Sequence, residues 1–156
     1  MYDKDSYWYK AVKSILDAQT QEECYRALRS QPAFGDFIAY QIYVDFTYIK
    51  EFPFSENEFT VSGVGCTKGL TYLFSDFDGL SYEEALFWLR DNIEQLANDI
   101  LKINLKFVLN KLMYDVPYYD RNMNVMSLEN CMCELGKYMD IINQTGRRRP
   151  KYKGVK

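Results

Sequence analysis

The sequence predicts an all-α fold, and three observations support that class. Apolar residues recur at steps of three and four along most of the chain, as they do on one face of a helix. Two capping boxes, Thr20–Glu23 and Ser81–Glu84, are typical of helix starts. The brief alternation of polar and apolar residues that is typical of a strand occurs only at residues 102–105. We therefore expect helices joined by turns.

Two helices are expected before Pro32. Ser6 is a candidate N-cap for the first of them, because its hydroxyl can accept a hydrogen bond from the first turn. The apolar stripe of this helix consists of Trp8, Val12, Ile15 and Leu16. The second helix begins at the capping box of Thr20 and ends before Pro32, since the residue preceding a proline avoids the helical conformation.

A third, strongly apolar helix is expected from Phe34 to about Ile49. Residues at three- and four-residue steps along one side of it are Phe37, Ile38, Gln41, Ile42, Asp45 and Tyr48. Pro53 ends this stretch, and a short capped turn over residues 55–59 leads to a glycine-containing hairpin. A further helix follows the hairpin from about Cys66 to Ser75.

The C-terminal half is expected to contain two more helices. Ser81 opens one whose core residues are Leu86, Leu89, Ile93 and Leu96. Residues 100–113 are ambiguous between helix and strand, and residues 114–122 read as a loop that could face a substrate. Ser127 caps a last helix to about Asn143, before Gly146 and Pro150 end the regular structure.

The length of 156 residues indicates one domain with a real core. We assign residues 1–146 to a single helical domain and residues 147–156 to a basic tail. The tail holds six basic side chains and no acid, whereas residues 1–146 hold 13 basic and 22 acidic side chains. This asymmetry favours contact with a polyanion through the tail, and the alternative is a solubilising disordered end.

Composition also narrows the chemistry. The chain has no histidine, which removes Ser-His and Cys-His nucleophile pairs and makes a zinc site improbable beside the C-x-C pair at Cys131 and Cys133. We expect no cofactor and no metal. The sequence has no run of about 18 apolar residues, and its charged start does not resemble a signal peptide. We expect no membrane contact and a cytoplasmic location, in the host cytoplasm if the gene is a phage's.

The hairpin Gly63-Val64-Gly65 is the most informative motif. It has the form of a helix-hairpin-helix turn spanning about residues 56–75, whose amides would hold a DNA phosphate at the start of a helix. The glycines would allow close approach and unusual φ angles, and Val64 would point into the core. Lys68, one turn later, would add a charged contact. The alternative is an ordinary turn that connects two helices.

Asp45 lies among apolar neighbours on the third helix, which predicts a partly desolvated carboxylate suited to general acid or base chemistry. The alternative is a carboxylate satisfied by amide groups or by a lysine. Tyr40 and Tyr48 lie near Asp45 in sequence, and either phenol could stack on a base or bind a phosphate. On the last helix Glu134 and Tyr138 share a face beside Lys137, and Glu134 with Lys137 is by itself typical of a surface ion pair.

Four blocks in order carry a resemblance to a known group of proteins. The blocks are residues 34–45, residues 54–59, the hairpin with Lys68-Gly69, and residues 133–138 followed by residues 146–151. This order resembles the helical proteins of phage thymine hypermodification. One branch comprises the α-glutamyl/putrescinyl-thymine pyrophosphorylases, or amino acid:DNA transferases. The other is the helical domain attached to 5-hydroxymethyl-deoxyuridine DNA kinases. Both are similar in fold to helix-hairpin-helix DNA glycosylases.

The resemblance implies a protein that acts on, or presents, a 5-substituted uracil in double-stranded DNA. Such a base must leave the stack before its substituent can react. In a transferase, an amine would displace a phosphate from the 5-hydroxymethyl group. Asp45 or Glu134 would then be the base, Lys137 would assist the leaving group, and Tyr40 would complete the catalytic set. Tyr48 and Tyr138 would stack on the base or line its pocket.

The DNA contacts implied by this interpretation are the hairpin residues Gly63, Val64, Gly65 and Lys68 and the tail residues Arg147, Arg148, Arg149 and Lys151. Many relatives have proline where this chain has Val64, and the chain is short for the family. It lacks the G-x-x-x-x-G-K-[ST] motif, so it is not itself a P-loop kinase.

Three alternatives remain open at this point. The first is a non-catalytic DNA-binding adaptor that recruits a DNA kinase or another modification enzyme. The second is a glycosylase that excises a base, which would leave abasic sites. The third is a structural virion protein, which would explain neither the hairpin nor the tail.

Overall fold

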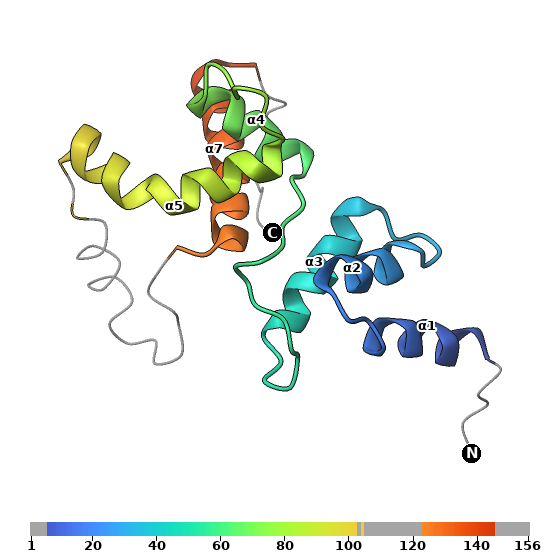
Figure 1. Cartoon of the computed structure of the whole chain (residues 1–156). Coiled ribbons are helices and arrows are strands. Elements are labelled where there is room, and N and C mark those ends of the chain that lie inside the picture. Colours follow the sequence, from blue (N-terminus) through green and yellow to red (C-terminus); the bar gives the residue numbers. More distant parts are fainter. Residues whose placement is uncertain (1–5, 103, 105–122, 146–156) are drawn as a thin grey trace, which may run out of the picture.

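The computed structural model describes residues 6–102, 104 and 123–145, which form helices joined by turns and irregular chain (Figure 1). The helices are α1 (Tyr7–Leu16), α2 (Gln21–Arg29), α3 (Asp36–Thr47), α4 (Val64–Leu73), α5 (Tyr82–Leu101) and α7 (Val125–Ile142). No strand occurs in these ranges, so the all-α prediction is confirmed for them.

Side-chain caps fix most of the helix starts. The hydroxyl of Ser6 accepts a hydrogen bond from the amide of Tyr9, as the sequence predicts. Both predicted capping boxes are complete, with Thr20 and Ser81 as the N-caps. The last helix begins earlier than predicted, because the Asn124 side chain rather than Ser127 is its cap.

The N-terminal half packs around aromatic side chains. Helices α1, α2 and α3 enclose a core that contains Cys24, Leu28, Ala39, Tyr40, Tyr43 and Val44. The side of α3 that carries Phe37, Ile38 and Tyr48 faces solvent, and the opposite side is buried. Helix α3 is apolar nearly all round, so its residue spacing does not determine which side faces the core.

The C-terminal half packs around α4 and α7. Cys66 and Leu70 from α4, Leu86 and Leu89 from α5, and Leu128 from α7 form its core. A Cβ atom added to Gly69 would lie 1.9 Å from the carbonyl oxygen of Met132. One added to Gly136 would lie 2.8 Å from the carbonyl oxygen of Gly65. The backbones of α4 and α7 therefore touch where these glycines cross.

The irregular segment 48–63 lies between the two halves and bonds to both (Figure 1). Gln21 at the start of α2 donates to Glu58 at 2.7 Å. Asn57 accepts from the Arg90 guanidinium through its carbonyl at 2.8 Å and from the Val125 amide through its side chain at 3.1 Å. These bonds attach the segment to α2, α5 and α7.

Several predictions fall outside the described residues: the loop at 114–122, nearly all of the ambiguous stretch after Leu101, and the basic tail at 147–156. Helix α5 extends to Leu101, so the ambiguous stretch begins as helix. Among the helices of residues 6–102 and 123–145, none has the length and hydropathy needed to cross a bilayer.

Candidate functional site: the start of α4 and its contacts with α7

The glycine hairpin forms the start of α4. Gly63 is the N-cap in an extended conformation with φ −76°, which any residue can adopt, and Val64 is the first helical residue. Val64 is 90% exposed, so the prediction that it points into the core is wrong. Residues 48–63 before α4 contain no helix, so α3 and α4 are not joined by a tight hairpin.

Two carboxylates accept hydrogen bonds from the backbone amides just before α4. Glu83 accepts hydrogen bonds from the Ser62 amide at 2.8 Å and from its hydroxyl at 2.5 Å. Glu129 accepts from the Gly63 amide at 3.5 Å and from the Cys133 thiol at 3.3 Å. Glu129 thus accepts from the Gly63 amide, which the sequence prediction assigns to a phosphate, and Glu83 accepts from the amide just before it. Only the amides further into the first turn of α4 remain for an external anion.

The second glycine of the hairpin serves helix packing. A Cβ atom at Gly65 would lie 3.2 Å from the sulfur of Cys133, and Gly69 packs still closer to α7. The prediction that the hairpin glycines supply unusual φ angles is wrong, because Gly63 is extended and Gly65 is helical. The spacing of Gly65 and Gly69 reflects the α4–α7 crossing.

Glu129 is a residue that the sequence analysis missed. It is 3% exposed, and burial raises the pKa of its carboxyl above the ordinary value. Burial, with the nearby Glu129 charge, raises the pKa of the Cys133 thiol to about 12, which favours the protonated thiol at neutral pH. The spacing in the sequence could have indicated that Glu129 is buried. This residue lies four residues after Val125 and one after Leu128, on the apolar side of α7.

Lys68 lies one turn into α4, as predicted, but it forms an ion pair with Asp140 on α7. On α7, Lys137 pairs with Glu134, and both side chains are more than half exposed. The adjacent Tyr138 is exposed as well. The structure thus brings Glu134 and Lys137 together on an open surface, as a surface ion pair.

The predicted residues of α3 separate between core and solvent. The expectation of a desolvated Asp45 is wrong, because this residue is exposed, and Tyr48 is exposed beside it. Tyr40 is buried, its hydroxyl lies 2.9 Å from the Thr60 hydroxyl, and burial raises the pKa of its phenol strongly. A buried ring cannot stack on an incoming base. Arg147, Arg148, Arg149 and Lys151 lie outside the described residues.

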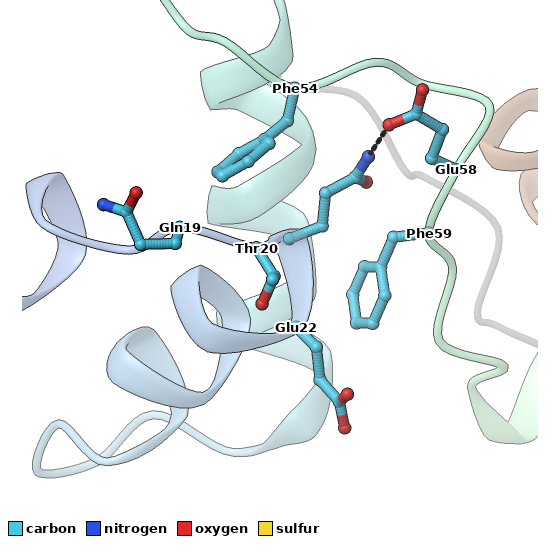
Figure 2. Close-up of a pocket in the computed structure, with 7 residues that line it drawn as sticks. Gln19, Thr20, Glu22, Phe54, Glu58 and Phe59 are labelled. Carbon is cyan, nitrogen blue, oxygen red and sulfur yellow. Dashed lines mark hydrogen bonds between the residues drawn. The ribbon is translucent and has the colours of Figure 1, made fainter.

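A separate pocket of about 420 Å³ opens at the start of α2 (Figure 2). Its lining residues are Gln19, Thr20, Gln21, Glu22, Phe54, Glu58 and Phe59. The Tyr43 hydroxyl donates to the Gln21 side chain at 2.5 Å, and Gln21 donates in turn to Glu58. The capping box at Thr20 is recognisable in the sequence, but the pocket is not, because Phe54 and Glu58 come from the irregular segment.

Comparison with known proteins identifies the family of this chain. A family model described as the helical domain of 5-hmdU DNA kinase matches residues 5–147. The 5-hmdU DNA kinase of Bacillus phage SP10 is 24% identical over 129 residues, which cover 78% of this chain and 18% of that kinase. No solved structure shows a significant match. The chain spans about a fifth of the length of the relative it matches. With residues 5–147 matched, the chain belongs to the family of 5-hmdU DNA kinase helical domains.

Proposed function

We propose that this chain is a DNA-presenting helical module of thymine hypermodification, which works beside a 5-hmdU DNA kinase activity without itself transferring phosphate. The observation that carries this proposal is the family match over residues 5–147 in a chain that lacks the P-loop motif. The kinase relative acts, by its name, on 5-hmdU in DNA. A module of this kind would hold that DNA for the kinase.

The distribution of charge indicates how DNA would be held. Most cations of the described surface are engaged by acids: Lys13, Arg26, Arg29, Lys68, Arg90 and Lys137 each pair with a carboxylate. Residues 147–156 hold six basic side chains without an acid. The tail would therefore supply most of the phosphate contacts, and the open first turn of α4 would add a weaker one.

The first test is DNA binding by fluorescence anisotropy across a salt series. Plain duplex would be compared with duplex carrying 5-hydroxymethyluracil or its phosphorylated form. We expect tighter binding to the modified duplex, and deletion of residues 147–156 should lower the slope of log affinity against log salt by up to about 5. Equal affinity for all duplexes would contradict base presentation, and no binding would contradict the proposal altogether.

The contribution of α4 is tested with Lys68→Ala. If DNA binds at the start of α4, Lys68 would have to exchange Asp140 for a phosphate, so its removal should weaken binding to all duplexes slightly and lower the salt slope by less than about 1. Arg26→Ala is the matched control, because Arg26 also pairs with an acid but lies on α2. If both variants bind alike, α4 is not part of the DNA contact.

Amine transfer is a second candidate function. Glu134 and Lys137 lie together on the exposed face of α7, which would put a base and a cation at one place. An amine-transfer assay on phosphorylated 5-hydroxymethyluracil DNA tests it. Turnover that survives Glu134→Gln and Asp45→Asn would contradict the assignment of these residues as bases. The exposure of both carboxylates makes the adaptor our first proposal.

A further inference from the structure

Helix α1 carries two adjacent apolar faces. Ala11 and Ile15 face the protein: Ala11 is buried, and Ile15 packs against the aromatic core. Trp8, Val12 and Leu16, at steps of four, are 72%, 53% and 76% exposed. Isolated exposed apolar residues are common, but three in a row on one helix form a stripe of the kind that marks an interaction surface. We call these three residues the α1 stripe.

An apolar groove of about 470 Å³ lies directly beside this stripe. Val12 and Leu16 form one wall, and Phe46, Ile49 and Phe52 contribute to the remainder. Among the described residues that line it, Glu51 alone is charged. A groove of this composition fits an amphipathic helix with anchors at three- and four-residue steps.

The protein itself contains a helix of that description, because the α1 stripe is such a set of anchors. A ridge next to a groove on one surface is self-complementary, which is what a two-fold interface requires. In an antiparallel pair of α1 helices centred on Val12, Leu16 of each copy faces Trp8 of the other, at the rim of the groove.

The exposed apolar area would form the centre of such a contact, and the polar residues around it would supply the remainder. An aromatic side chain offers about 150–250 Å², so Trp8, which is 72% exposed, contributes more than about 100 Å² alone. With Val12, Leu16 and the groove walls, the apolar patch reaches several hundred Å². A specific interface needs about 800 Å² from each partner. The exposed Lys13–Asp17 pair lies on the same helix and provides polar rim.

We propose that two copies of this chain associate through α1, with the α1 stripe of each copy covering the groove of the other. The occupant of the groove is thus a second copy. The contact lies on α1, in the half of the chain opposite α4 (Figure 1), so it leaves the start of α4 accessible.

The test is sedimentation velocity of the full chain, without DNA, over a range of concentrations. The expected result is a mass of two chains at high concentration. Leu16→Glu should weaken association at least tenfold. Its circular dichroism should match that of the unchanged chain, because the Leu16 side chain already faces solvent. Ile141→Glu is the matched control, since Ile141 is 74% exposed but lies on α7, and it should leave association unchanged.

A cross-linking experiment tests the two-fold axis itself. In a Cys131→Ser background, which removes the exposed native thiol, Val12→Cys should be joined to its own counterpart by a short bismaleimide. Ile141→Cys in the same background should not. A mass of one chain at every concentration, or association indifferent to Leu16→Glu, would overturn the proposal. So would a single chain that binds a 5-hmdU DNA kinase through this face.

Discussion

The two halves of the molecule are stabilised in different ways. In the α4–α7 half, helices meet backbone to backbone across Gly69 and Gly136. In the α1–α3 half, rings fill the space: Tyr43 alone contacts Tyr40, Phe52 and Phe59. The α4–α7 half depends on the absence of side-chain atoms at particular positions. The α1–α3 half depends on large aromatic side chains and on the hydroxyl groups that its tyrosines carry.

This difference predicts opposite sensitivities. Adding one methyl group should damage the α4–α7 crossing, because two backbones cannot move apart locally. In the aromatic half, removing one polar atom should be costly, because buried groups would lose their partners. Three substitutions test this contrast.

The largest effect is expected from Gly69→Ala. Its Cβ would lie 1.9 Å from the Met132 carbonyl oxygen, so α4 and α7 would have to separate. We expect a loss of at least about 2 kcal/mol in the free energy of unfolding, despite the small gain in helix propensity. Urea denaturation followed by circular dichroism measures it.

Gly35→Ala is the control for that substitution. Gly35 is the N-cap of α3, and no atom of the described residues lies within 4 Å of a Cβ added there. The loss should stay below about 1 kcal/mol, the cost of a poorer cap. Equal losses at the two glycines would show that α4 and α7 are not in close contact.

The second substitution, Tyr43→Phe, acts on the aromatic half. It removes the hydroxyl that donates to Gln21 at 2.5 Å and leaves a buried amide oxygen without a donor. The expected loss is about 1–3 kcal/mol. Tyr25→Phe is the matched control, because the Tyr25 hydroxyl makes a long, exposed bond to Asp36 at 3.4 Å. A similar loss from both would mean that burial of the hydroxyl is unimportant.

The third and smallest effect has the opposite sign. Burial raises the pKa of Glu129, so the folded state holds its proton more tightly than the unfolded chain. The charged carboxylate therefore destabilises the fold, increasingly as pH rises from the ordinary glutamate pKa through the raised one. Glu129→Gln should be more stable than the unchanged chain at pH 8, and the difference should disappear below about pH 4. Unfolding curves from pH 4 to 8 measure this, and a difference independent of pH would contradict it.

Much of the secondary structure was predictable, because helix starts depend on local chemistry. Ser6, Thr20 and Ser81 each cap a helix through bonds within four residues. The buried side of α3 was not predictable from the sequence. Phe37 and Ile38 are as apolar as Tyr40 and Val44, and packing against α2 and segment 48–63 selects between the two sides.

The candidate site was harder to predict for a related reason. A glycine pair before a helix is compatible with phosphate binding and with close packing, and the choice rests on Cys133 and Met132, about seventy residues away in sequence. Glu83 and Glu129 approach the hairpin from other helices in the same way. Local patterns contain no information about such distant partners.

Segment 48–63 has a consequence for how this chain can change in evolution. Loops without regular structure usually accept extra residues. Here three consecutive residues are tied to three different helices: Glu56 to Asn124, Asn57 to Arg90 and Val125, and Glu58 to Gln21. One inserted residue between Glu56 and Glu58 would put at least one of these side chains out of register. We expect length to be fixed here as strictly as in a helix, and length variation among relatives to lie elsewhere.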